Sequence, residues 1–187
     1  SRRPLVSVVV AAYQAARHVR SALASVSAQT AGDLEVVVVD DGSTDGTAAE
    51  VAAAAREDRR IRLLRLGRNR GQSAALNAGM ASARGRFLAL LDADDEATPD
   101  RLALQLAALE REPDLVLVGG AVATFCDRTG ASGEVWRYAT GDSEIRARSL
   151  FKSEVISGAI TFDLERARRR RLRFDEGLRL GADWAFS

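Results

Sequence analysis

The chain has 187 residues, and its 27 basic and 26 acidic side chains give a formal net charge of only +1. This balance disfavours a protein that binds nucleic acid or a membrane through its overall charge, and a hydrophobic fraction of 47% is too high for a disordered chain. The single cysteine, Cys126, excludes a disulfide framework and a multi-thiolate metal site. No apolar run approaches the roughly 20 residues that span a bilayer. We therefore expect a reduced, cytoplasmic globular domain without a transmembrane segment or a nucleic-acid partner.

Residues 5–118 alternate between short apolar runs and longer amphipathic or alanine-rich segments. The runs predict strands buried on both faces, and the segments between them predict helices of about 10–15 residues. This alternation is typical of a mostly parallel sheet with helices on both faces, whose crossovers bring the loops after the strands to one edge. In chain order we predict strand 5–10, helix 16–28, strand 34–39, helix 47–56, strand 61–66, helix 73–84, strand 87–91, helix 99–110 and strand 115–118.

The alternation ends at Gly119-Gly120. Two β-rich segments around a glycine-containing turn predict a hairpin, and Trp136 within it is expected to be buried. We find no internal repeat or linker, and we expect one domain over 1–187, divided into a half 1–120 and an irregular half 121–187 that is truncated at its C-terminus. The predicted elements of the second half are hairpin strands 122–126 and 134–138, helix 142–150, strand 160–162 and a basic helix 164–171.

Acidic residues follow two of the predicted strands directly. Asp40 and Asp41 come after strand 34–39, and Asp92, Asp94 and Asp95 come after strand 87–91. Because open α/β sheets bind ligands at the carboxyl ends of their strands, we expect these acids at a binding site. Carboxylates this close repel one another unless a cation or a sugar hydroxyl lies among them. The spacing of Asp92 and Asp94 suits one divalent ion with oxygen ligands, and a solvated loop is the alternative.

Other segments at this edge suit a nucleotide. Ala11 and Ala12 are small enough for a flat ring to approach the backbone, and Tyr13 offers an aromatic face for stacking, although a packing role is equally open. Segment 69–72 enters a helix and predicts backbone N–H groups available to anions. No dinucleotide glycine fingerprint or phosphate-binding loop is present, which disfavours a dehydrogenase or an ATPase. For His18, the only histidine, we favour a surface or packing role.

Asp183 stands in the last motif, Gly181-Ala182-Asp183-Trp184, where a helix is predicted to begin. An aspartate at this place can cap the helix. It can also take a proton from an attacking hydroxyl as a general base.

In their order and spacing these motifs resemble those of the inverting glycosyltransferases of family 2, which have the GT-A fold, a Rossmann-like α/β architecture. The resemblance covers nearly the whole chain. Its segments are 6–13 (VSVVVAAY), 25–30 (SVSAQT), 38–47 (VVDDGSTDGT), 69–79, 91–95 (LDADD), 99–102 (PDRL), 174–176 (FDE) and 183–184 (DW).

The resemblance implies a donor site for a nucleotide-diphosphate sugar, with a UDP-sugar favoured. Ala11, Ala12 and Tyr13 would border the base, and Asp41 would accept a hydrogen bond from it. Gln14 stands where the family usually has Asn, and Leu76 stands where Arg is common, which removes one contact to the diphosphate.

The resemblance also implies a metal site and a catalytic base. Asp92-Ala93-Asp94 matches the DxD motif, with Asp94 as a direct ligand of Mn²⁺ or Mg²⁺ and Asp92 shared between metal and ribose. Asp183 matches the acid that deprotonates the acceptor, although Ala182 replaces the Glu that usually precedes it.

The implied reaction transfers the sugar with inversion to a carbohydrate or lipid-linked acceptor, in polysaccharide or glycan synthesis. The domain would work in the cytoplasm, with contact to the inner face of the membrane as an open alternative. Two other hypotheses remain: a nucleotide-sugar-binding module with little or no activity, and a nucleotidyltransferase.

Overall fold

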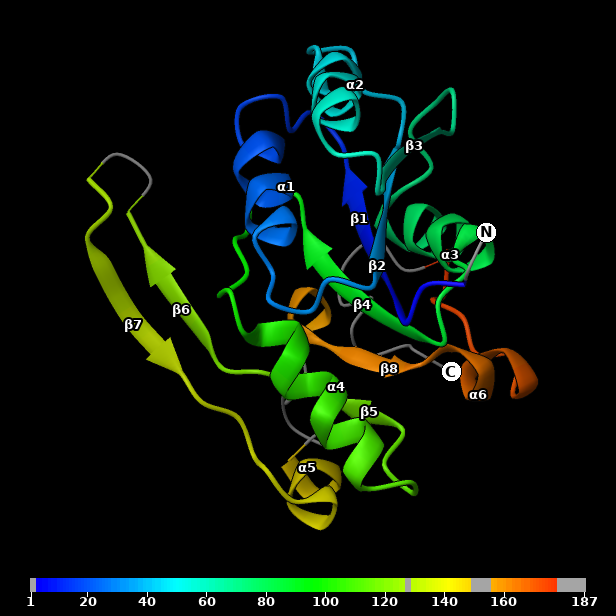
Figure 1. Ribbon diagram of the computed structural model, residues 1–187, viewed down its shortest axis with the longest axis vertical. Coiled ribbons are helices and arrows are strands. Elements are labelled where there is room, and N and C mark those ends of the chain that lie inside the picture. The colour runs from blue at the N-terminus through cyan, green and yellow to red at the C-terminus, as the bar shows by residue number, and fades with distance from the viewer. Residues whose placement is uncertain (1–2, 127–128, 149–155, 178–187) are drawn as a thin grey trace.

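The central element is a six-stranded sheet in the order β3-β2-β1-β4-β8-β5 (Figure 1). The structure, a computed structural model, describes residues 3–126, 129–148 and 156–177. The first four strands in this order are parallel to one another, and β8 runs antiparallel to both of its neighbours. The mostly parallel α/β sheet predicted from the sequence is therefore confirmed. The strands are β1 (Val6–Ala12), β2 (Leu34–Asp40), β3 (Ile61–Arg65), β4 (Phe87–Asp92), β5 (Leu117–Val118) and β8 (Thr161–Asp163).

Helices cover both faces of the sheet because its inner strands are apolar on both sides. Val8 and Val10 of β1 pack in a cluster with helices α1, α2 and α4, whereas Val9 packs in a second cluster with α3 and α6. Successive side chains of a strand point to opposite faces, so a continuous run of valines supplies both clusters. The helices are α1 (Val19–Ser27), α2 (Thr47–Glu57), α3 (Gln72–Ser82), α4 (Arg101–Arg111) and α6 (Leu164–Arg169).

The register of the central strands brings the predicted acids to one edge. Ala12 at the end of β1 pairs with Asp40 at the end of β2, and Ala11 pairs with Asp92 at the end of β4. Three neighbouring strands therefore end at the same level, with the alanines of β1 between the two acidic loops.

Strand β8 lies between β4 and β5, so the segments before and after Gly120 share one sheet. Its register pairs Leu88 on one side and Leu117 on the other with Phe162. A short 3₁₀ turn, η1 (Ser157–Ala159), precedes β8 and packs against β4.

The predicted hairpin is confirmed as β6 (Val122–Phe125) and β7 (Ser132–Trp136), followed by α5 (Asp142–Arg148). Figure 1 shows it projecting away from the sheet. The predicted burial of Trp136 is wrong: it is 47% exposed, and the other residues of β7 are exposed as well. Within the described ranges, no helix combines the length and apolar character needed to cross a bilayer.

Two helices begin later than the sequence predicts. Gln14 has a φ of 51°, and the N–H groups of Ala15 and Ala16 donate to the Thr47 hydroxyl (2.9 Å) and to Asp45 Oδ2 (3.0 Å). These contacts hold the chain after β1 in a loop, so α1 begins at Val19 instead of residue 16. Helix α4 begins at Arg101 instead of residue 99.

Candidate functional site

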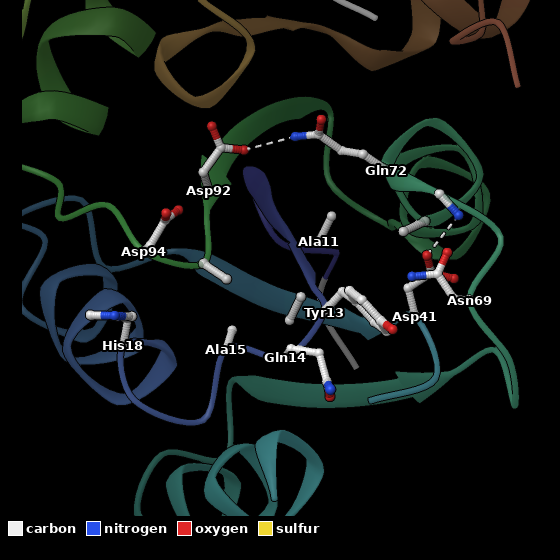
Figure 2. A pocket seen from close by; sticks show the side chains of 14 residues that line it. Ala11, Tyr13, Gln14, Ala15, His18, Asp41, Asn69, Gln72, Asp92 and Asp94 are labelled. Carbon is white, nitrogen blue, oxygen red and sulfur yellow. Dashed lines mark hydrogen bonds between the residues drawn. The ribbon is translucent and has the colours of Figure 1, made fainter. Parts of the chain in front are cut away.

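A cavity of about 450 Å³ opens at the carboxyl edge of the sheet, between the ends of β1, β2 and β4 and the start of α3 (Figure 2). Asp40 and Asp95, which the sequence also placed at this edge, do not line the cavity. The cavity does bring together every donor- and metal-site residue that the resemblance implies within the described part of the chain. These residues are Ala11, Ala12, Tyr13, Asp41, Asp92, Ala93 and Asp94. The predicted base, Asp183, lies outside the described residues.

The carboxylate of Asp41 is buried and holds the loop that leads into α3. Its Oδ1 accepts from the N–H of Arg70 and its Oδ2 from the N–H of Gly71, both at 2.8 Å. Gly42 follows with a φ of 77°, and a Cβ on it would lie 2.5 Å from the backbone of Arg68, so the two loops approach too closely for a side chain. The positive end of the α3 dipole adds to these hydrogen bonds, which explains how an anion is stable at this buried place.

The sequence predicted that backbone N–H groups of segment 69–72 are available to an outside anion. Those of Arg70 and Gly71 are not, because Asp41 already accepts from both. A carboxylate offers about four lone pairs, so Asp41 keeps acceptor capacity for a ligand after binding the two N–H groups.

Tyr13 lies on the loop after β1 and is 51% exposed on the pocket wall. The loop is fixed by Gln14, whose N–H donates to the Ser43 hydroxyl (3.1 Å) and whose Oε1 accepts from the N–H of Thr44 (2.8 Å). Gln14 thus ties the loop after β1 to the loop after β2. The aromatic face of Tyr13 is held at the pocket without being covered by the fold.

The acidic loop after β4 lies on the other side of the pocket from Asp41 (Figure 2). Asp92 ends the strand and is partly exposed, Ala93 is buried, and Asp94 is exposed. Oδ1 of Asp92 accepts from Nε2 of Gln72 at 3.2 Å. The next acid, Asp95, turns back, and its N–H donates to the carbonyl of Asp92 (3.2 Å).

The electrostatics of this loop are those of crowded negative charge. Burial and the neighbouring charge of Asp94 raise the pKa of Asp95, and Arg101 opposes the rise. Burial lowers the pKa of Arg101 to about 10, with Asp95 and Asp92 acting in the other direction, so the guanidinium stays charged at neutral pH. Arg101 therefore lies behind the acidic loop, whereas Asp92 and Asp94 lie on its pocket side.

The donor set fits a divalent metal that shares its coordination with a substrate. Asp92 and Asp94 supply carboxylate oxygens, the ligands that Mg²⁺ and Mn²⁺ prefer. Among the described residues no group of three or more His, Cys, Asp or Glu side chains is arranged to hold a metal alone. Such ions usually bind through one or two carboxylates together with substrate phosphates and water.

His18 was not predicted at the pocket, and segment 69–72 was predicted there through its backbone N–H groups and not through its side chains. His18 at the start of α1 was assigned a surface or packing role, yet it lines the pocket, as do Asn69 and Gln72 (Figure 2). The position of His18 at the start of a helix does not indicate which loop lies opposite it. The place of Gln72 depends on the crossover that sets α3 beside β4.

The segment after α6 returns toward the site along α3. The side chain of Asn77 pairs with both main-chain groups of Phe174, each at 2.9 Å, and also donates to Glu176 (3.1 Å). Arg70, next to the loop held by Asp41, forms an ion pair with Glu176 at 3.1 Å. The last described residues are therefore held beside the start of α3.

Comparison with known proteins agrees with this geometry. Residues 7–162 match the family described as Glycosyl transferase family 2. The chain belongs to glycosyltransferase family 2. It is 40% identical over 189 residues to the succinoglycan biosynthesis protein ExoO of Rhizobium meliloti, covering 97% of this chain and 54% of that protein. An uncharacterized glycosyltransferase of Haemophilus influenzae is 28% identical over 190 residues, covering 98% of this chain and 59% of the relative.

Solved structures share the fold. The mannosyltransferase PcManGT of Pyrobaculum calidifontis, solved with GDP-Man and Mn²⁺, superposes with a TM-score of 0.72 at 26% identity, over 99% of this chain and 51% of that one. Residues 1–349 of S. aureus TarS, solved with UDP, superpose with a TM-score of 0.71 at 21% identity, over 97% of this chain and 53% of that fragment. The predicted GT-A architecture is confirmed. This family 2 chain spans 51% to 59% of the length of ExoO, the Haemophilus protein and PcManGT, and 32% of the longer TarS chain.

Proposed function

We propose that this domain transfers a sugar from a nucleotide-diphosphate sugar to an acceptor hydroxyl, with inversion and with the help of a divalent metal ion. One observation carries the proposal: a single pocket places an exposed aromatic face and Asp41 opposite Asp92 and Asp94. The two sides match the two ends of the donor, an uncharged base and a charged diphosphate.

The base is proposed to lie on the β1 side of the pocket. Tyr13 would stack on it, Ala11 and Ala12 leave room for its edge, and Asp41 would accept from one of its N–H groups. Because the loops around Tyr13 and Asp41 are held by hydrogen bonds within the protein, they need little reorganisation on binding.

The metal-diphosphate end is proposed to lie on the β4 side. Asp94 would bind the metal, and Asp92 would be shared between the metal and the ribose. A bound Mn²⁺ or Mg²⁺ supplies Lewis-acid stabilisation of the charge that develops on the leaving diphosphate. The carboxylates hold and orient the ion, and their own repulsion is relieved when it binds.

Asp183 is proposed as the base. It would take the proton of the acceptor hydroxyl as the new bond forms at the anomeric carbon and the bond to the diphosphate breaks. The acceptor is proposed to be a carbohydrate or a lipid-linked glycan of polysaccharide synthesis, as the name of ExoO suggests. We place the reaction in the cytoplasm, against the inner face of the membrane if the acceptor is lipid-linked.

Nucleotide binding with and without metal tests the proposal. Titration calorimetry of the chain with UDP and with GDP, each with Mn²⁺ and with a chelator, compares the donor favoured by the sequence with that of the mannosyltransferase. Asp94→Asn should lower the Mn²⁺-dependent affinity at least about tenfold, and Glu96→Gln, an exposed acid on the same loop outside the pocket, should leave it unchanged. Affinity that is independent of metal and unchanged in Asp94→Asn would overturn the metal role.

A donor-binding module without transfer activity is the second candidate. In the family that this motif resembles, a Glu usually precedes the catalytic Asp, and here Ala182 replaces it. Release of nucleoside diphosphate from the bound donor separates the two. The transferase predicts slow donor hydrolysis that is lost in Asp183→Asn while donor affinity is kept. The binding module predicts no hydrolysis in either protein.

A further inference from the structure

The carboxylate of Asp92 is contacted on two sides by residues outside the acidic loop. On one side, Nε2 of Gln72 donates to Oδ1 at 3.2 Å (Figure 2). On the other side, η1 lies so close that a Cβ placed on Gly158 would be 2.6 Å from Oδ2 and 3.0 Å from Cγ. The φ of Gly158 is outside the left-handed region. Space beside Asp92, and not backbone conformation, therefore requires a glycine at this position.

Helix α4 holds η1 in this place through buried polar contacts. Gln105 donates from Nε2 to the carbonyl of Ala159 (2.9 Å), and its Oε1 accepts from the Thr161 hydroxyl (2.7 Å). Gln105 is 5% exposed and Thr161 is fully buried. Leaving a buried polar group without its partner costs about 1–3 kcal/mol, so these contacts fix the segment that carries Gly158.

Arg101 makes the same connection one turn earlier on α4. Its guanidinium donates to the carbonyl of Leu90 on β4 (2.7 Å) and to that of Ile160 after η1 (3.4 Å). The N–H of Leu90 in turn donates to the carbonyl of Ile160 at 3.0 Å. The strand that ends in Asp92 and the turn that touches Asp92 are thus joined by one side chain behind the acidic loop.

We propose that the turn at Gly158, held by Arg101 and Gln105, is a positioning element that sets the orientation of the Asp92 carboxylate together with Gln72. The inference rests on the proposed function and deepens it: a turn in the second half of the chain orients the metal-diphosphate site through Asp92. Gly158, Gln72, Arg101 and Gln105 act through Asp92 and are positioning residues.

The geometry sets the size of the effect. Ordinary van der Waals contact begins at 3.4 Å, so a methyl group at residue 158 would push Oδ2 of Asp92 away by about 0.8 Å. Metal–ligand distances tolerate deviations of only about 0.2 Å, and a displacement of about 1 Å at a reacting centre can cost roughly 100-fold. The shortest contact is with the end of a side chain, which can move, and the contact with the backbone N of Asp92 at 3.3 Å needs a shift of only about 0.1 Å. The fold can therefore accept the methyl group, but Asp92 cannot keep its orientation.

The experiment compares Gly158→Ala with Gly120→Ala in the full chain. A Cβ on Gly120 would lie 3.6 Å from the carbonyl of Ala159 and from Nε2 of Gln105, an ordinary contact in the same neighbourhood. The measured quantity is the ratio of the Kd of UDP, and of GDP, without and with Mn²⁺. We expect Gly158→Ala to reduce this ratio about 10- to 100-fold, as outer-shell changes at metal sites do, and Gly120→Ala to leave it unchanged.

Gln72→Ala is the second variant, because Gln72 is exposed and its loss should not disturb folding. It should also reduce the Mn²⁺ dependence, whereas a merely structural role would change only Tm. If Gly158→Ala does not fold, Gln72→Ala decides the outcome. An unchanged ratio in these variants, with Asp94→Asn still sensitive, would overturn the inference and leave the proposed function standing. An insensitive Asp94→Asn would overturn both.

Discussion

Replacing Asp41 by Asn removes the negative charge and turns one of its two acceptors into a donor. Both oxygens of Asp41 accept from backbone N–H groups at 2.8 Å, and the side chain is 2% exposed. In Asp41→Asn, the NH₂ group would face the N–H of Arg70 or Gly71, so one hydrogen bond to a charged group is lost and one buried donor is left without a partner. Hydrogen bonds to charged groups contribute about 1.5–3 kcal/mol. For a chain of this size, that loss lowers Tm by about 3–12 °C.

The assay is thermal unfolding of the two proteins at neutral pH without nucleotide. Asp94→Asn is the matched control, because it makes the same chemical change at an exposed carboxylate in the same pocket and should leave Tm within about 1 °C. Nucleotide affinity should fall in both variants. If Asp41→Asn unfolds at the temperature of the unmodified protein, the carboxylate does not hold the loop before α3, and our account of the pocket wall is wrong.

Two further predictions concern one residue each. Tyr13→Ala should weaken nucleotide binding about 5- to 150-fold, because one base–aromatic stack contributes about 1–3 kcal/mol. It should not lower Tm, because half of the side chain is exposed. Tyr13→Phe should bind normally in the same titration, and an equal loss of affinity in both variants would refute stacking. Burial would raise the pKa of Glu35, but hydrogen bonds from Ser7 and Arg84 and the charge of Arg62 outweigh it and lower the pKa below its ordinary 4.5. The ionised form therefore stabilises the fold above pH 4.5, and this contribution is lost as the pH falls through the lowered pKa. Urea unfolding should show the largest difference between the unmodified protein and Glu35→Gln at pH 7, shrinking below pH 4.5, and a difference that grows in acid would contradict the network.

The sequence predicted the parallel part of the fold because each strand there is a mostly apolar segment and helical segments separate the strands. The place of β8 could not be predicted in this way. Thr161–Asp163 is three residues long, and its neighbours in the sheet, Phe87–Ala89 and Leu117–Val118, are far away in the chain. The late start of α1 had a similar cause, since it follows from the hydrogen bonds of Ala15 and Ala16 to the next loop.

The residues of the site likewise fall into those that the sequence could predict and those that depend on distant contacts. Asp41, Asp92 and Asp94 could be predicted because each follows a strand end, and strand ends share an edge in a parallel sheet. Gly158 could not, because its distance to Asp92 is set by α4 and β8 together. In the sequence Gly158 is only a glycine, and a glycine alone does not indicate that it packs against Asp92.

The acids at this edge differ in the groups that surround them, and the difference supports the roles proposed for them. Asp41 is buried, and two backbone N–H groups at the start of α3 satisfy it without any cation. Asp95 lies beside the buried charge of Arg101. Asp92 receives the neutral amide of Gln72, and Asp94 extends into the pocket and raises the pKa of its neighbour. Asp92 and Asp94 both line the pocket on the β4 side, which supports the proposal that a divalent ion and a diphosphate bind there. The buried, hydrogen-bonded carboxylate of Asp41 supports the proposed contact with an uncharged base.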